Sequence, residues 1–248
     1  MKKIVTFLIL LSFAVSVSAQ SKVDCTADRY EKDIFPTFNK QTVEYTKTKG
    51  WQIENQPLLV DIYQPKDDSA TLRPLIILAH GGSFIGGKKE QVAPFCTGLV
   101  KKGYVTASIQ YRLIPLNKVA ESNNILRELV RAINDMKAAV RFFRQSVANG
   151  NPYKIDPNNI FVGGVSAGAI TALHVGLLDE DDKISDDLAK LITEEGGFNG
   201  DTGSTENRKF SSKVSGIINL SGSILDENWI DKTDAPVFSY HGEADLIV

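Results

Sequence analysis

The stretch that decides the fold is NIFVGGVSAGAITALHVGLL, residues 159–178. Its first part, NIFVGG, is an apolar run that ends in glycines, which is typical of a buried strand. Its second part, SAGAITALHVGLL, predicts a helix. The junction GVSAG, residues 164–168, matches G-x-S-x-G, a motif in which a serine stands on a tight turn between a strand and a helix. The stretch therefore predicts a strand–turn–helix unit with Ser166 at the turn.

Strand-like and helix-like segments alternate on both sides of this unit. PLIILAHGG (74–82) is a nearly continuous apolar run, as expected of a central strand, and residues 122–148 carry one apolar stripe at three- and four-residue steps, as expected of a long helix. This alternation predicts an α/β fold with a mainly parallel sheet covered by helices on both faces. The other expected elements are an antiparallel edge hairpin at 41–48 and 57–65, a helix at 91–102, and strands at 104–113, 214–222 and 235–242.

The amino terminus has the pattern of an export signal. Lys2 and Lys3 precede an apolar core, and the small residues VSA precede Gln20. A membrane anchor is the alternative, but the apolar run of about 14 residues is shorter than the roughly 20 that span a bilayer. We expect a signal peptide at 1–19, a secreted or periplasmic protein and no stable membrane anchor.

The rest of the chain suits one domain. We expect an N-terminal segment at 20–40 and one α/β domain at 41–248, with a polar, acidic insertion at about 179–212 that forms a solvated cap or excursion over the sheet. The net charge of −2 and the lack of a polybasic run argue against a nucleic-acid partner. The oligomeric state cannot be predicted.

Two cysteines, Cys25 and Cys96, are present. An exported protein could join them in a disulfide, or both could be free thiols, and the sequence leaves both alternatives open. No His/Cys cluster has the spacing of metal ligands, and the acidic insertion lacks the pattern of a calcium loop, so no metal site is expected.

Two motifs at the ends of predicted parallel strands supply candidate donors for an oxyanion hole. The N–H of Ala167, next to Ser166 at the start of a helix, points where an oxyanion would develop. HGGSF, residues 80–84, lies at the end of the central strand, where the N–H groups of Gly82 and Ser83 could complete an oxyanion hole. The overlapping GSFIGGKK nearly fits a P-loop, but Lys89 stands where that motif needs Ser or Thr.

The segment FSYHGEADLIV, residues 238–248, supplies a candidate acid. Asp245 follows a predicted strand and comes after Ser166 in the chain, the serine-then-acid order of one known triad arrangement. In such triads the acid orients a histidine and stabilises its imidazolium. Asp245 is therefore the candidate triad acid.

Together, HGGSF, YRL (111–113), IDPNNIFVGGVSAG (155–168) and HGEAD (241–245) resemble the α/β-hydrolase superfamily, in its esterase/lipase branch with an HGG oxyanion loop. The resemblance implies that Ser166 is the nucleophile, Asp245 the triad acid, and Gly82, Ser83 and Ala167 the oxyanion donors. It also implies hydrolysis of carboxylic esters through an acyl-enzyme without a cofactor, on small-molecule or carbohydrate-linked esters such as acetyl or feruloyl groups. Ser83 departs from the family pattern, which usually has a third glycine there.

The catalytic histidine is the larger departure. His80 opens the oxyanion loop, His174 lies two helical turns from Ser166 with an expected packing role, and His241 precedes the acid, so none suits the base. In the family the histidine follows the acid beyond one more strand. We therefore expect a C-terminally truncated sequence that lacks the last strand and helix, and little turnover by residues 1–248 alone. A peptidase of the same superfamily and a ligand- or partner-binding pseudoenzyme are the alternatives.

Overall fold

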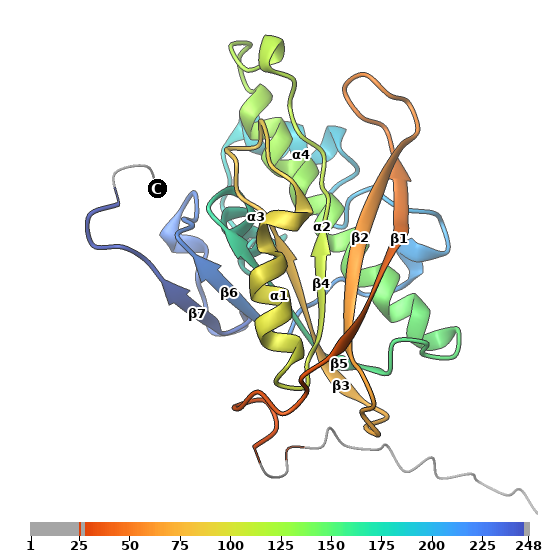
Figure 1. Ribbon diagram of the computed structural model, residues 1–248. Helices are drawn as coiled ribbons and strands as arrows, with labels where there is room; N and C mark the ends of the chain where they lie inside the picture. Colours follow the sequence, from red (N-terminus) through yellow and green to blue (C-terminus); the bar gives the residue numbers. More distant parts are fainter. Residues whose placement is uncertain (1–24, 26–27, 246–248) are drawn as a thin grey trace, which may run out of the picture.

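The computed structural model describes residue 25 and residues 28–245; the predicted signal peptide at 1–19 lies outside them. Within this part of the chain, seven strands form one sheet in the order β1-β2-β4-β3-β5-β6-β7 (Figure 1). The first two strands form the expected hairpin, β2 is antiparallel to β4, and the rest of the sheet is parallel. The strands are β1 (Phe38–Thr48), β2 (Gln56–Pro65), β3 (Arg73–Ala79), β4 (Val105–Ile109), β5 (Ile155–Val165), β6 (Gly216–Leu220) and β7 (Val237–Tyr240).

The predicted helices are present with shifted ends. In place of the helix predicted at 91–102, the structure has a 3₁₀ turn at Lys89–Val92 followed by α1 (Ala93–Val100). The long helix is α2 (Asn124–Ala148), and the helix after Ser166 is α3 (Ala167–Leu177). A fourth helix, α4 (Asp186–Glu194), lies in the acidic insertion. Among the described residues, no helix is long and apolar enough to cross a membrane.

Side chains of the central strand β3 alternate between two cores. Leu75 and Ile77 pack with α2 and α3 on one face of the sheet, whereas Ile76 and Leu78 pack with Cys96 and its neighbours from α1 on the other. Because successive strand residues point to opposite faces, a fully buried strand needs apolar residues at every position. The predicted α/β architecture with helices on both faces is thus confirmed.

Both cysteines are free thiols. Cys25 is exposed and Cys96 is fully buried on α1. Burial raises the pKa of the Cys96 thiol to about 12, so it stays protonated and unreactive at neutral pH. Of the two alternatives left open by the sequence, the structure has the unpaired thiols.

The acidic insertion at 179–212, which was expected to be a solvated cap or excursion, packs closely against α2. The apolar side of α4 is buried through Leu188 and Leu191. Beyond α4, polar side chains of α2 donate to backbone carbonyls of the insertion. These bonds are Asn134 Nδ2 to Glu195 O (2.8 Å), Lys137 Nζ to Phe198 O (2.6 Å) and Arg141 Nη2 to Thr202 O (2.8 Å). The insertion is therefore a layer packed on α2, because its backbone depends on α2 for hydrogen bonds.

β7 is an edge strand of the sheet with exposed apolar side chains. Phe238 is 65% exposed and Tyr240 is 71% exposed. Natural proteins usually cover or charge such edges, because unpaired strands with apolar side chains invite association.

Candidate active site

The site lies at the carboxyl ends of the parallel strands β3, β5, β6 and β7. The predicted oxyanion loop follows β3, Ser166 and Ala167 follow β5, and Asp245 comes five residues after the end of β7. Since β5, β6 and β7 are neighbours in the sheet, all of these residues leave the sheet at the same edge. This is where ligands bind in open α/β sheets.

Ser166 has a strained backbone between β5 and α3. Its φ is 51° and its ψ is −121°, a conformation that costs a non-glycine residue roughly 1–3 kcal/mol. Two hydrogen bonds hold it: the Ser166 N–H donates to Leu220 O of β6 (2.9 Å), and the Ser166 carbonyl accepts from the Ile170 N–H (2.8 Å). The side chain is partly exposed at the sheet edge. A strained backbone that hydrogen bonds stabilise at a partly exposed serine is typical of a nucleophile on such a turn.

The glycines of GVSAG allow the close contact of strand and helix that the turn needs. A Cβ on Gly168 would lie 2.3 Å from Ala79 O and 2.7 Å from His80 O, and a Cβ on Gly164 would lie 2.4 Å from the Gly168 carbonyl carbon. All of these neighbours are backbone atoms, which cannot move aside as a flexible side chain can.

Gly168→Ala is therefore expected to lower the free energy of unfolding by about 2–3 kcal/mol through overpacking. Gly98→Ala is the matched control, because Gly98 lies in α1 and its added Cβ meets nothing within 4 Å. Alanine there should raise stability by about 0.5–1 kcal/mol through helix propensity. Urea unfolding of the two variants measures both effects, and equal stabilities would contradict the close-contact argument.

The loop after β3 carries three consecutive residues with positive φ: Gly82 (123°), Ser83 (53°) and Phe84 (62°). The loop touches the serine turn, since a Cβ on Gly81 would lie 3.0 Å from Val165 O and 3.3 Å from Ser166 Cβ. Within residues 28–245, neither the Gly82 nor the Ser83 N–H donates to a backbone acceptor outside regular elements. Ala167, as the first residue of α3, has an N–H without an intrahelical acceptor. These donors are available to an oxyanion.

His80 braces this loop. Its ring is 1% exposed, stacks on Tyr111 with a 4.4 Å centroid distance, and its Nδ1 lies 2.8 Å from Gly81 O. Because a carbonyl only accepts, Nδ1 carries the proton in this contact. The Tyr111 hydroxyl donates to His80 O (2.8 Å), and burial lowers the pKa of His80. His80 is therefore a neutral structural residue, in agreement with its expected role in holding the loop.

The other two histidines also have structural contacts. His174 is fully buried; its Nδ1 donates to Ile170 O (2.8 Å) and its Nε2 accepts from the Leu225 N–H (3.4 Å), which agrees with the expected packing role. His241 lies at the end of β7 with its Nε2 3.5 Å from Asp245 Oδ2. The structure thus gathers Ser166, Ala167 and the Gly82–Ser83 loop, and sets Asp245 beside His241 on the far side of β6.

An apolar groove of about 520 Å³ is lined by residues that include Ile170 of α3 and Phe84 of the loop after β3. Ile170 lies one helical turn beyond Ser166 on α3, Phe84 directly follows Ser83, and Leu225 comes five residues after the end of β6. Phe84 and Leu129 are buried at its floor, while Glu121, Asn123 and Ser223 are exposed at its mouth. The sequence did not predict this groove, although Ile170, an apolar residue four positions after the predicted nucleophile, could have indicated an apolar wall there.

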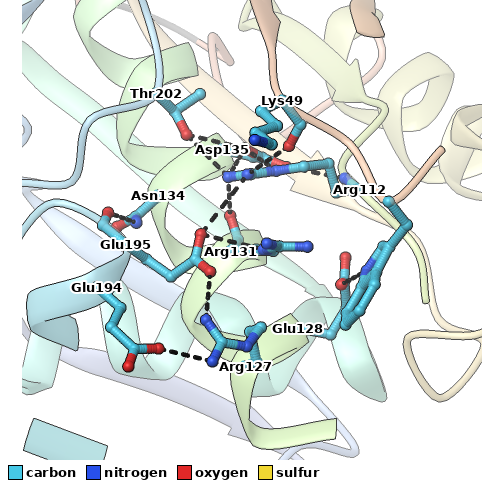
Figure 2. Close-up of polar contacts among 11 residues, drawn as sticks. Lys49, Arg112, Arg127, Glu128, Arg131, Asn134, Asp135, Glu194, Glu195 and Thr202 are labelled. Carbon is cyan, nitrogen blue, oxygen red and sulfur yellow. Dashed lines mark hydrogen bonds and ion pairs between the residues drawn. The ribbon is translucent and has the colours of Figure 1, made fainter. Parts of the chain in front are cut away.

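A buried polar network connects α2, the loop after β4 and the insertion (Figure 2). At its centre, Arg112 donates to Asp135 through Nε and Nη2 and also reaches Thr202 Oγ1 (2.9 Å). Asp135 accepts in addition the Arg112 backbone N–H (2.8 Å). On the insertion side, Glu195 pairs with Arg131 (3.0 Å) and Arg127 (2.8 Å).

Glu128, also on α2, forms no ion pair with any of the described residues. Its carboxyl is fully buried, Oε2 accepts from Trp51 Nε1, and Oε1 has no hydrogen-bond partner among the described residues. Burial, with the charge of Asp135, raises the pKa of Glu128 to about 7, and the Trp51 bond, Arg112 and Arg131 oppose this rise. The carboxyl is therefore protonated in slightly acidic solution.

This gives a pH prediction with a definite sign. The pKa of Glu128 is higher in the folded state than in the unfolded chain, so the folded protein holds an extra proton between about pH 4.5 and 7, and its stability falls as the pH rises through this range. Glu128→Gln cannot ionise. The stability of Glu128→Gln relative to the wild type should therefore increase by about 3 kcal/mol from pH 4.5 to pH 8. Urea unfolding at both pH values measures this, and a difference that does not change with pH would refute it.

Comparisons with known proteins identify relatives of this chain. The family model described as BD-FAE matches residues 60–224. Esterase-5A of Drosophila persimilis is 31% identical over 125 residues, which are 50% of this chain and 22% of the esterase. The non-reducing polyketide synthase atr1 of Stereocaulon alpinum is 27% identical over 163 residues, 65% of this chain and 6% of the synthase. The chain therefore spans less than a quarter of the length of these curated relatives.

The fold is also that of solved esterases. The native structure of the Thermogutta terrifontis esterase Est2 has a TM-score of 0.60 and 20% identity, covering 84% of this chain and 72% of that one. Esterase 2 of the same organism, phosphonylated by cyclosarin, has a TM-score of 0.60 and 21% identity, covering 86% and 74%. At such identities the likeness concerns the fold. The family match extends over more than half of the chain, from β2 to the loop after β6, and the protein therefore belongs to the BD-FAE family and has the α/β-hydrolase fold of these esterases.

Proposed function

We propose that the protein is an exported serine hydrolase that cleaves carboxylic esters through an acyl-enzyme. The observation that carries the proposal is the strained Ser166 on a strand-to-helix turn, in contact with a glycine loop. Within residues 28–245, the Gly82 and Ser83 N–H groups of this loop donate to no backbone acceptor outside regular elements. The esterases among the relatives and the structural neighbours support the reaction class. The pattern of residues 1–19 supports export.

In this mechanism Ser166 Oγ attacks the ester carbonyl carbon. The carbonyl oxygen becomes an oxyanion that accepts hydrogen bonds from the N–H groups of Ala167 and of Gly82 or Ser83, each bond contributing about 3 kcal/mol to transition-state stabilisation. A histidine takes the serine proton and gives it to the departing alcohol, and Asp245 orients that histidine. Water then attacks the acyl carbon of the acyl-enzyme; the histidine takes a proton from the water and gives it to Ser166 Oγ as the bond to the serine breaks, and the carboxylic acid leaves. The steps need no cofactor.

We propose that this histidine is supplied by residues that follow Val248. His80 and His174 are buried with their ring nitrogens engaged in the structural contacts above, and His241 precedes Asp245 rather than following it. On this proposal residues 1–248 alone turn over little ester, while the protein that includes the following residues is active. Small-molecule or carbohydrate-linked esters are the proposed substrates.

Active-site labelling tests the proposal. A fluorophosphonate should react with Ser166 in the protein that includes the residues encoded after Val248, with the label located by mass spectrometry of the serine-containing peptide. The Ser166→Ala variant should not react. A folded protein that remains unlabelled would contradict the proposal and would favour a pseudoenzyme that only binds its ligand.

A further inference from the structure

Phe84 belongs to two parts of the site at once. Its backbone is the last of the three positive-φ residues of the oxyanion loop, directly after Ser83. Its side chain is 6% exposed and forms part of the floor of the apolar groove. A bulky residue rarely adopts a φ of 62°, so something must hold Phe84 in this conformation.

Contacts on both sides of Phe84 hold it. Its carbonyl accepts from the Ile114 N–H (2.9 Å), and its ring lies edge-on to Tyr111 with centroids 6.5 Å apart. Tyr111 in turn stacks on His80 and donates to the His80 carbonyl, which fixes the other end of the same loop. The position of the Phe84 ring is therefore linked to the backbone that carries the Gly82 and Ser83 N–H groups.

The groove beside Phe84 fits an uncharged acyl chain. Its inner wall is apolar, formed by Phe84, Leu129 and Ile170. Glu121, the charged residue at its mouth, is neutralised by Lys118, with Nζ to Oε1 at 2.6 Å. An anionic acyl group would lose its hydration there without a charge partner, whereas each buried methylene of an alkyl chain gains favourable transfer energy.

We propose that Phe84 is a positioning residue through which the acyl chain of an ester sets the oxyanion loop. This inference rests on the proposed function. A chain that fills the groove presses on the Phe84 ring and favours its strained backbone, so the Gly82 and Ser83 N–H groups stay aimed at the developing oxyanion. Part of the binding energy of the chain is then expressed in the rate of acylation and not only in affinity.

The test is the acylation step of p-nitrophenyl acetate, butyrate and hexanoate, followed as the stopped-flow burst in the protein that includes the residues after Val248. The burst gives the acylation rate constant and the substrate dissociation constant separately. In the wild type the acylation rate constant should rise with chain length, by up to about three- to fourfold per methylene. In Phe84→Ala it should fall about tenfold or more for the hexanoate and become nearly independent of chain length.

Leu126→Ala is the matched control, because Leu126 also lines the groove but belongs to α2 and not to the loop. It should weaken binding of the hexanoate several-fold and keep the dependence of the acylation rate on chain length. Phe84→Leu, which still fills the space beside Tyr111, should restore most of the dependence. Should Phe84→Ala not fold, Phe84→Val should show a weaker dependence than Phe84→Leu.

Two results would overturn the inference, and they differ from each other. If Phe84→Ala behaves like Leu126→Ala, with weaker binding and an unchanged dependence of acylation on chain length, Phe84 is only a wall of the groove. If the wild type shows no burst and no labelling of Ser166, the proposed function fails and the inference fails with it.

Discussion

Ser166→Ala is expected to lower kcat/KM for p-nitrophenyl acetate by about 10⁴- to 10⁶-fold in the protein that includes the residues after Val248. The variant lacks the atom that forms the acyl-enzyme, so the two-step route is closed. The oxyanion donors and the groove remain, and they should leave a residual rate of about 10³–10⁴-fold over the uncatalysed reaction. Initial-rate measurements with active-site titration of the wild type give the ratio.

Ser215→Ala is a suitable control for this experiment. Ser215 directly precedes β6, at the amino-terminal end of this strand and away from the carboxyl ends where Ser166 lies; its Oγ donates to Asn158 O (2.7 Å). Its replacement should leave kcat/KM within about twofold of the wild type. Hydrolysis by Ser166→Ala at more than a hundredth of the wild-type rate would show that the reaction does not pass through this serine.

The sequence predicted the elements whose signals are local. GVSAG was readable because its tight turn needs glycines at fixed positions, and the structure has backbone atoms less than 3 Å from where their Cβ atoms would be. The central strand was readable because burial on both faces requires an unbroken apolar run. The helix α2 was predictable for a different reason: its apolar residues recur at three- and four-residue steps and form one stripe.

Features that depend on contacts between distant segments could not be predicted from the sequence. No local pattern indicates that Asn134, Lys137 and Arg141 of α2 each donate to a carbonyl of the insertion, because these partners are about 60 residues away in the chain. Glu128 of α2 likewise looks like an ordinary helix-surface residue, and only the fold buries it and places Trp51 against its carboxyl. The groove is formed by segments that meet only in the fold, so its apolar character could not be predicted from any one of them.

Arg112→Met is expected to lower the free energy of unfolding by about 3–5 kcal/mol, the largest stability effect among these variants. The Arg112 side chain is 2% exposed and that of Asp135 is 0% exposed. Removing the guanidinium leaves a buried carboxylate without its countercharge, and also removes the donors to Lys49 O (3.1 Å) and Thr202 Oγ1 (2.9 Å). Urea unfolding with an unchanged m value would measure this loss.

The double variant Arg112→Met/Asp135→Leu separates the two contributions to that loss. Most of the cost of breaking a buried pair is the charge left behind, so replacing both residues by apolar ones should recover much of the stability. Lys209→Ala is the exposed control: its pair with Glu206 has side chains 63% and 67% exposed, and its loss should cost less than about 1 kcal/mol. If Arg112→Met were no more harmful than Lys209→Ala, the pair would not anchor the contact between α2 and the loop after β4. If the double variant were as unstable as the single one, the loss would come from the hydrogen bonds to Lys49 and Thr202, and these bonds rather than the ion pair would hold the insertion and the β1–β2 loop against α2.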